Sequence, residues 1–172
     1  MRVISGDFGG RKLLAPDGLA TRPTTDKVRQ AVFNSLGSMG VLDGATVADL
    51  YAGCGALGIE ALSRGAASCV FVERDRGALA ALKANLKALD LESRSHVAAT
   101  DVIAYAPGIA EVDIALVDPP YTFTNWDGLL LFLRAGLVVA ESERAVEPTE
   151  GWEVVRTKRY GRTVITMLER LP

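Results

Sequence analysis

Short runs of apolar residues alternate along the middle of the chain with segments in which apolar residues recur every three to four positions. The runs are typical of buried strands, and the recurring positions are typical of amphipathic helices. The predicted strands end at Leu50, Glu73, Ala98, Asp118 and near Glu143. The predicted helices cover residues 56–64, 76–89 and 126–134. Such alternation predicts a parallel sheet with helices on both faces.

Both ends of the chain carry antiparallel patterns. Residues 2–5 and 11–14 flank a glycine-containing loop and predict a small N-terminal β-hairpin arm. Residues 152–160 and 163–169 predict a second hairpin that turns at Gly161. We therefore expect a mixed sheet that ends in an antiparallel hairpin.

A further helix is predicted between the arm and the first buried strand. Thr24 or Thr25 is placed to cap its start, since a threonine hydroxyl can accept a hydrogen bond from the first helical turn. Its apolar face repeats every four positions and consists of Val28, Val32 and Leu36. The helix is expected to stop at residues 37–40, and Arg29 and Asn34 are expected on its polar face.

The strand that ends at Asp118 is followed by Pro119, Pro120 and Tyr121. Two prolines cannot continue a central strand, because they lack a backbone N–H, so the Pro119 carbonyl is left to face any cleft beyond the strand end. Asp118 adds a second acceptor, and Tyr121 adds an aromatic face. Two acceptors beside an aromatic ring can hold the exocyclic amine of a stacked base. The ordinary alternative is a strand-to-loop exit with turn prolines.

A glycine-rich turn follows the strand that ends at Leu50 and contains Gly53, Gly55 and Gly58. Glycines in such a turn let the backbone approach a nucleotide-like ligand. The next strand ends at Glu73, about twenty residues further on, where a carboxylate is expected to bind two ribose hydroxyls.

The same glycines match the dinucleotide fingerprint, so a nicotinamide or flavin enzyme stays open. Asp49 favours a different cofactor, because a carboxylate near this turn would repel a pyrophosphate and attract an ammonium. S-adenosylmethionine carries such an ammonium, whereas NAD does not. Asp101, after a further predicted strand, is expected to accept a hydrogen bond from the adenine amine.

These positions together resemble, in order and spacing, the Rossmann-like S-adenosylmethionine-dependent methyltransferases that act on exocyclic amines. Residues 4–13 and 21–34 narrow the resemblance to the bacterial 16S rRNA guanine-N2 methyltransferases of the RsmD type, through Ile-Ser-Gly-x-x-x-Gly-Arg-Lys-Leu and Thr-Arg-Pro-Thr-Thr-Asp-Lys-Val-Arg-Gln-Ala-Val-Phe-Asn. It covers nearly the whole chain. The resemblance implies a mostly parallel seven-stranded sheet and methylation of one guanine of small-subunit ribosomal RNA, of the guanine-966 type, within an assembled particle.

The candidate site residues fall into three groups. The catalytic positions are Asp118, Pro119, Pro120 and Tyr121. The cofactor-binding positions are Asp49, Tyr51, Gly53, Gly55, Glu73, Arg74, Asp101 and Val102. The RNA-binding positions are Arg11, Lys12, Arg22, Thr24, Arg29 and Asn34. Residues 1–22 are expected to form an RNA-facing arm, and residues 23–172 are expected to form the methyltransferase domain.

Composition adds several expectations. A chain of 172 residues with 49% hydrophobic content suits a single core, and we expect a monomer. No apolar run reaches the roughly 18 residues that cross a bilayer, so a cytoplasmic protein without a membrane partner is expected. Cys54, Cys69 and His96 lack metal-site spacing, and no metal is expected.

The net charge of −2 hides a segregation along the chain. Residues 1–30 hold six Lys or Arg against three Asp, and residues 152–172 hold five against two Glu. The stretch between them holds eight against sixteen acids. If the two basic ends pack on the same side of the domain, they would present a positive face to RNA phosphates.

Three other functions stay open. An adenine-N6 methyltransferase acting on DNA or RNA would hold its target amine in the same way. A protein-glutamine methyltransferase would act on a planar carboxamide, although those enzymes usually carry Asn at the position of Asp118. A non-enzymatic RNA-binding assembly factor would keep the cofactor site without using it.

Overall fold

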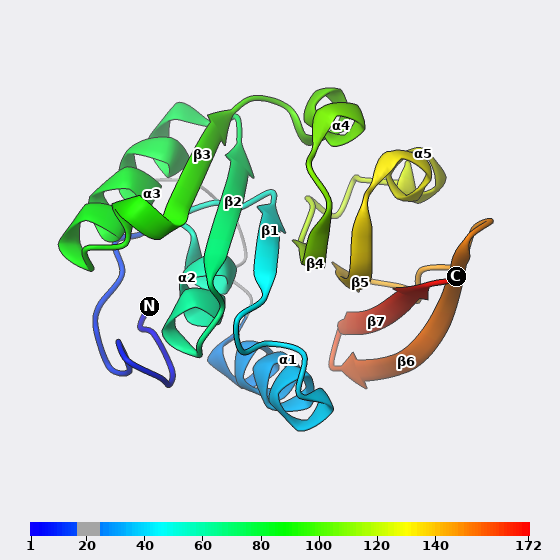
Figure 1. Cartoon of the computed structure of the whole chain (residues 1–172), viewed down its shortest axis with the longest axis horizontal. Helices are drawn as coiled ribbons and strands as arrows, with labels where there is room; N and C mark the ends of the chain where they lie inside the picture. The colour runs from blue at the N-terminus through cyan, green and yellow to red at the C-terminus, as the bar shows by residue number, and fades with distance from the viewer. Residues whose placement is uncertain (17–24) are drawn as a thin grey trace.

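The computed structural model describes residues 1–16 and 25–172. Within them, one seven-stranded sheet has the strand order β3-β2-β1-β4-β5-β7-β6 (Figure 1). The strands are β1 (Thr46–Leu50), β2 (Ser68–Glu73), β3 (Ser95–Ala99), β4 (Val112–Val117), β5 (Ala135–Ser142), β6 (Trp152–Tyr160) and β7 (Thr163–Arg170). Strands β1 to β5 run parallel, and β7 pairs antiparallel with both β5 and β6. The predicted Rossmann-like fold class is confirmed.

The described residues contain five α-helices and two short 3-10 turns, η1 (Glu92–Arg94) and η2 (Ala106–Gly108). The helices are α1 (Asp26–Met39), α2 (Ala56–Ser63), α3 (Arg76–Ala88), α4 (Val102–Tyr105) and α5 (Trp126–Phe132). Four of them match predicted helices to within two residues at each end. The prediction missed α4, because four residues are too few to show a helical period. No helix among residues 1–16 and 25–172 is long and apolar enough to cross a membrane.

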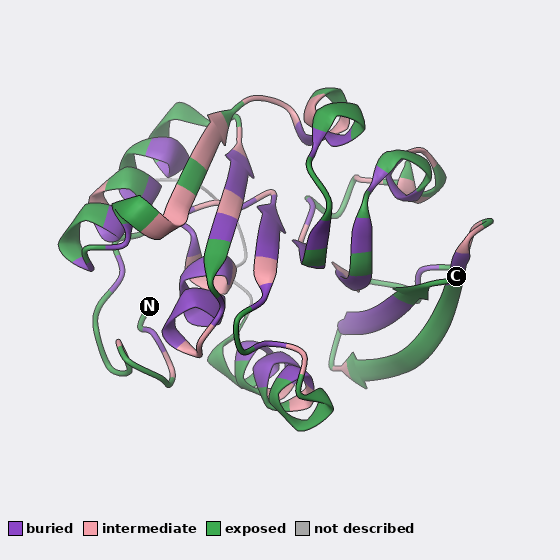
Figure 2. Cartoon of the chain, viewed as in Figure 1, coloured by how far each residue is buried: buried purple, intermediate pink, exposed green. Residues whose placement is uncertain are grey.

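Alternate residues of the strands enter two separate cores. Val47, Phe71 and Ile114 pack on the face that α1, α2 and α3 cover. Their neighbours, such as Ala48 and Val72, pack on the opposite face with α4 and α5. Figure 2 shows the central strands mostly buried, whereas β6 is exposed along nearly its whole length. The central strands are thus covered on both faces, as parallel sheets require.

Helix α1 begins and ends as its sequence predicts. The Thr25 hydroxyl accepts a hydrogen bond from the Val28 N–H at 3.3 Å, which satisfies a donor of the first turn. Gly40 ends the helix with φ of 68°, a left-handed conformation that glycine adopts without steric cost. The other predicted cap, Thr24, lies outside the described residues.

The N-terminal arm is less regular than the predicted pair of strands. It contains one isolated antiparallel bridge, between Arg2 and Lys12. The bridge consists of two bonds of 3.0 Å, from the Val3 N–H to the Arg11 carbonyl and from the Leu13 N–H to the Met1 carbonyl, and the Gly10 N–H adds a bond to the Val3 carbonyl at 2.8 Å. The N–H groups of the next two residues, 4 and 5, are bonded instead to a side chain of α2. The arm is therefore held against the body of the domain.

Close packing fixes one glycine of α2. A Cβ on Gly58 would lie 2.3 Å from Cε1 of Phe71 and 2.7 Å from Sγ of Cys69. Both neighbours are buried in β2 and cannot move outward. Gly58 therefore permits the contact between α2 and the sheet that positions the preceding turn.

We expect Gly58→Ala to lower the free energy of unfolding by about 1–3 kcal/mol, as overpacking of a core usually does. Gly37→Ala is the matched control, because a Cβ there meets no atom within 4 Å among the described residues. That change should raise stability by about 0.5–1 kcal/mol, since alanine is the better helix former. Urea denaturation measures both, and equal midpoints for the two variants would contradict the close contact.

Candidate active site

The predicted acidic residues meet at the carboxyl ends of three adjacent strands. Leu50 of β1 pairs with Val72 of β2 on one side and with Val117 of β4 on the other. Glu73 and Asp118 directly follow these two partners. The connections after β1 and before β4 pass over opposite faces of the sheet, and open sheets bind ligands at such a switch point.

The turn between β1 and α2 has an unusual backbone. Tyr51 has φ of 65°, which is uncommon for a residue with a side chain. Gly53 and Gly55 also have positive φ, at 57° and 88°. A Cβ on Gly53 would meet no described atom within 4 Å, so the backbone here borders open space. The turn therefore offers a ligand direct access to the main chain.

Three backbone N–H groups hold the Glu73 carboxylate beside this turn. The Gly53 N–H donates to Oε2, and the N–H groups of Arg74 and Asp75 donate to Oε1, each at 2.8 Å. A carboxylate has about four acceptor positions, so Glu73 keeps about one for a hydroxyl group of a ligand. The bonds fix its orientation before a ligand binds.

Asp49 is a buried carboxyl group, 1% exposed. Its Oδ2 accepts a hydrogen bond from the Gly58 N–H at 2.8 Å. Burial raises the pKa of Asp49 well above its usual value, the Gly58 bond opposes this, and the charges of Asp118 and Glu73 raise the pKa further. A cation placed against this group would relieve its repulsion from the other two acids.

Asp101 lies just beyond the end of β3 and has a structural role that the sequence analysis did not predict. Its Oδ1 accepts from the N–H groups of Ile103 and Ala104, at 2.9 and 3.3 Å, and so caps α4. Its Oδ2 pairs with Nη1 of Arg74 at 3.2 Å. Val102, the first residue of α4, is buried in the core. A contact between Asp101 and an adenine amine stays a prediction.

The strand exit at Asp118 places its residues in different environments. Asp118 is partly buried, Pro119 is buried and Pro120 is exposed, while Tyr121 is 49% exposed. The Pro120 carbonyl accepts a hydrogen bond from the Phe123 N–H at 2.8 Å, which closes a turn after the proline pair. An accessible aromatic ring thus follows directly after the carboxylate.

Two aromatic residues that the sequence analysis missed connect this exit to the glycine turn. The ring of Phe123 lies 5.6 Å from that of Tyr51 and 5.1 Å from that of Trp126, centroid to centroid. Burial, with the charge of Asp101, raises the pKa of Tyr51 to about 12 against the opposing effect of Arg74. The Tyr51 phenol therefore stays neutral at physiological pH. The signal in the sequence that could have revealed this contact is a second aromatic residue, Phe123, two positions after Tyr121.

The predicted RNA-binding residues are scattered. Arg11 is exposed and donates from Nη2 to the Ala88 carbonyl at 3.1 Å, and Lys12 is exposed beside it. Asn34 is exposed, with Oδ1 accepting from Arg64 Nη1 at 3.2 Å. The two remaining surface candidates, Arg22 and Thr24, lie outside the described residues.

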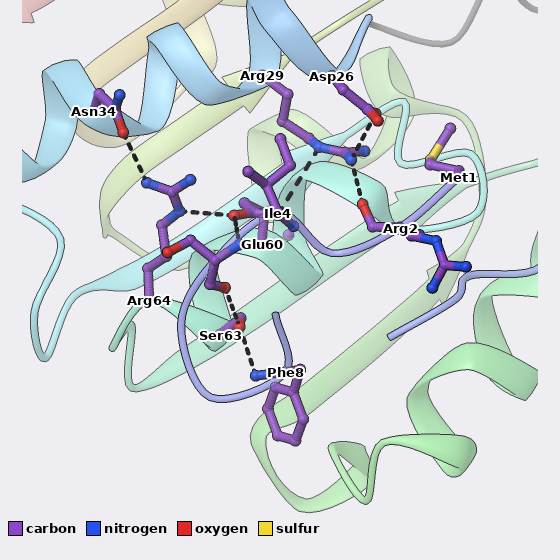
Figure 3. A network of polar contacts seen from close by, with 12 residues as sticks. Met1, Arg2, Ile4, Phe8, Asp26, Arg29, Asn34, Glu60, Ser63 and Arg64 are labelled. Carbon is purple, nitrogen blue, oxygen red and sulfur yellow. Dashed lines mark hydrogen bonds and ion pairs between the residues drawn. The ribbon is translucent and has the colours of Figure 1, made fainter. Parts of the chain in front are cut away.

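The prediction that Arg29 lies on an accessible polar face is wrong. Its side chain is completely buried between α1 and α2 (Figure 3). Nη2 donates to the Arg2 carbonyl and to Oδ1 of Asp26, and Nε lies 3.9 Å from Oε2 of Glu60. The reason is Glu60, also fully buried, whose charge offsets part of the cost of burying the guanidinium. Arg29 therefore cannot contact RNA phosphates in this conformation.

Glu60 holds the arm in place. Its Oε2 accepts from the Ile4 N–H at 2.8 Å, and its Oε1 accepts from the Ser5 N–H at 3.1 Å and from Nε of Arg64 at 2.7 Å (Figure 3). Nε and Nη1 of Arg29 make no hydrogen bond to any part of the chain that the structure describes. The arginine charge consequently depends on Glu60 and on the exposed Asp26.

We expect Glu60→Gln to lower the free energy of unfolding by roughly 3–5 kcal/mol, because it leaves the buried Arg29 charge without its buried partner. The Ile4 and Ser5 amides should also exchange hydrogen faster, which native-state exchange measures. Asp26→Asn is the control. Its carboxylate is 69% exposed, so its loss should cost no more than about 1 kcal/mol. Similar losses for both variants would show that Glu60 is not the anchor.

Comparison with known proteins identifies the family of the protein. Residues 1–169 match the model of the family described as "Conserved hypothetical protein 95". The chain belongs to this family. It is 39% identical to "Putative rRNA methyltransferase YlbH" of Bacillus subtilis, over 99% of both chains. It is 40% identical to "Ribosomal RNA small subunit methyltransferase D" of Escherichia coli over 70% of this chain and 60% of that protein.

A solved structure supports the same assignment. The "Putative methyltransferase yhhF" of Escherichia coli superposes with a TM-score of 0.86, at 35% identity, over 99% of this chain and 97% of that one. The protein is an S-adenosylmethionine-dependent methyltransferase. Its residues fit the cofactor: Gly53 borders open space, Glu73 is a fixed acceptor for hydroxyl groups, and Asp49 is a buried acid suited to an ammonium.

We expect Asp49→Asn to weaken S-adenosylmethionine binding about 10- to 100-fold, since a hydrogen bond to a charged group contributes about 1.5–3 kcal/mol. Binding to the native protein should tighten as the pH rises through the raised pKa of Asp49, because the ionised form pairs with the ammonium. The variant should lack this pH dependence. Titration calorimetry across pH measures both effects.

The same substitution should change stability in the opposite direction. Because the folded pKa of Asp49 is raised, its stabilising contribution is present below the unfolded pKa and is lost as the pH rises through the folded pKa. The cofactor-free Asp49→Asn protein should therefore be the more stable form at neutral pH. Asp113→Asn, at the opposite end of the sheet, is the control and should leave cofactor binding unchanged. Equal affinity and equal pH dependence in Asp49→Asn would disprove the ammonium contact.

Proposed function

We propose that the enzyme transfers the methyl group of S-adenosylmethionine to the exocyclic N2 amine of a guanine in 16S ribosomal RNA. The observation that carries the proposal is the Asp118–Pro119 exit of β4, which lies beside the strand end that bears Asp49. The relative named ribosomal RNA small subunit methyltransferase D supports the choice of RNA as the substrate.

The strand exit supplies the groups that would hold the base. The Asp118 carboxylate and the Pro119 carbonyl accept the two hydrogens of the amine, which fixes the direction of the nitrogen lone pair. The half-exposed ring of Tyr121 offers the stacking face for a base taken out of its helix. Phe123 and Trp126 pack edge to face beside this loop and support its conformation.

Positioning is the main source of catalysis in this mechanism. The bound cofactor supplies an electrophilic methyl group on a sulfonium. The lone pair of guanine N2 is delocalised into the ring, so the amine is a poor nucleophile. Alignment of reacting groups contributes up to about 7–11 kcal/mol in favourable cases. Asp118 stabilises the positive charge that develops on N2, and we assign to it the proton that the nitrogen loses.

The substrate that we propose is the small ribosomal subunit or its 16S RNA. An enzyme with this substrate works in the cytoplasm, and one chain holds every residue that the mechanism uses. Base extrusion favours a target that is already unpaired, because less stacking energy is lost.

The first test is methyl transfer to small subunits that lack their native methylations. We expect N2-methylguanosine in the digested RNA of the subunits or of naked 16S RNA. Duplex DNA and a glutamine peptide serve as parallel substrates. N6-methyladenine as the product, labelled glutamine, or no transfer despite cofactor binding would each contradict the proposal.

Two variants separate binding from chemistry. Asp118→Ala should lower kcat by about 100- to 1,000-fold, which is the usual effect of removing one polar group at a reacting centre. Cofactor affinity should change little. Glu73→Ala should weaken cofactor binding about tenfold or more, because it removes an oriented charged acceptor. Asp127→Ala, an exposed acid on α5, is the control for loss of charge near the loop. Equal loss of cofactor affinity in the first two variants would refute this division of roles.

A further inference from the structure

A groove of about 340 Å³ runs between α1 and the β6–β7 hairpin. Figure 1 shows the helix and the hairpin side by side at the lower edge of the molecule. The polar side chains along it are Asn34, Ser35 and Ser38 from α1, and Arg156, Lys158 and Tyr160 from β6. None of them belongs to the cofactor crevice, which we define by Asp49, Gly53 and Glu73 at the strand ends.

The strand register places the three β6 residues on one face. Arg156 pairs with Met167, Lys158 with Ile165, and Tyr160 with Thr163. Met167 and Ile165 pack in the same core as α1, so their partners on β6 also face α1. Alternation along the strand sends the residues between them to the opposite face.

Contacts within the groove hold its cations in place. Nη1 of Arg156 donates to the Ser35 hydroxyl, which joins β6 to α1. Nζ of Lys158 lies 5.2 Å from the centroid of the Tyr160 ring, within the range of a cation–π contact. The groove thus presents two positive charges and one aromatic ring along a single strand.

The Tyr160 end of the groove lies at the edge of the sheet that holds the active site. Val164, which follows the hairpin turn, pairs with Ser142 at the carboxyl end of β5. The turn at Gly161 therefore lies at the same edge as Asp118. Three strand spacings of 4.7–4.9 Å separate β4 from β6, which is a distance of about 14 Å. Nucleotides beside a base held at Asp118 are within reach of the groove.

The chemistry of the groove matches a nucleic-acid backbone. Both charged residues among its described lining residues are cations, although the chain as a whole carries a net charge of −2. Phosphate oxygens bind arginine, lysine, serine and asparagine side chains, and unpaired bases stack on tyrosine. A protein segment would gain less, since an acidic peptide does not need the partly buried ring of Tyr160 at one end of the groove.

We propose that the groove between α1 and β6 binds the sugar–phosphate backbone of the RNA next to the target guanine. This inference rests on the proposed function, which supplies the RNA strand. The two cations contact phosphates, the α1 side chains donate hydrogen bonds, and Tyr160 stacks on a flanking base. The groove is a second contact region that positions the target nucleotide over the crevice.

Charge reversal in Arg156→Glu/Lys158→Glu tests the groove, with undermethylated small subunits as the probe. We expect KM to rise at least tenfold while kcat and S-adenosylmethionine affinity stay close to native. The milder Arg156→Ala/Lys158→Ala protein should show a salt slope of RNA binding that is smaller by about two, because two phosphate contacts are lost. Ser35→Ala tests the hydrogen bond to Arg156 alone and should change KM less than twofold.

The matched control is Lys83→Glu/Arg134→Glu, which changes the charge equally on exposed residues of α3 and before β5. Its KM should stay within twofold of native. Equal KM increases in the groove variant and in this control would overturn the proposed RNA contact in the groove, because they would show only a general electrostatic effect.

Ultraviolet crosslinking gives a readout that does not depend on turnover. Crosslinks between RNA and residues 156–160, lost on charge reversal, would support the groove. Native transfer without such crosslinks, or crosslinks from these residues to a ribosomal protein, would overturn it and leave the proposed function intact. Absence of methyl transfer by the native protein would overturn the proposed function, and the crosslink to RNA would still decide the groove.

Discussion

The candidate active site depends on a concentration of negative charge at the carboxyl ends of β1, β2 and β4. Asp49 is buried there with a raised pKa, and the charges of Asp118 and Glu73 add to its repulsion. The fold tolerates this cost because backbone N–H groups orient the carboxylates of Asp49 and Glu73. A protein that only needed stability would place apolar residues here. The retained charge instead suits the ammonium and hydroxyl groups of the cofactor that we propose to bind here.

A second buried acid solves a different problem on the other side of α2. Glu60 joins the N-terminal arm, α1 and α2 through bonds to Ile4, Ser5 and Arg64 and through the charge of Arg29. Gly58 lies two residues before Glu60 and donates its N–H to Asp49. One short helix therefore anchors both the cofactor turn and the arm. We expect a substitution that displaces α2 to affect both regions, because α2 is hydrogen-bonded to the arm and to Asp49.

Sequence patterns predicted the features that local chemistry determines. Thr25 caps α1, the hairpin turns at Gly161, and Glu73 ends β2 beside the glycine turn, because each depends on neighbours within a few residues or on strand alternation. Burial of Arg29 was not predictable, since it depends on Glu60, which is thirty-one positions away. The helix α4 was missed because four residues are too few to show a helical period, whereas the ring contacts of Phe123 arise only when separate strand ends come together.

The basic residues at the two ends of the chain are used in different ways. At the N-terminal end, Arg29 is buried against Glu60, and Arg11 is bonded to a carbonyl of α3. These cations stabilise the arm. The positive charge that this segment offers to an RNA strand is therefore smaller than its number of basic residues suggests. The cations of β6 lie on an exposed edge strand, where charge also discourages pairing with a second sheet. Because Arg156 is joined to α1 through Ser35, that charge is oriented and borders a groove. Position in the fold, more than the count of basic residues, therefore decides which end of the chain offers a surface for phosphates.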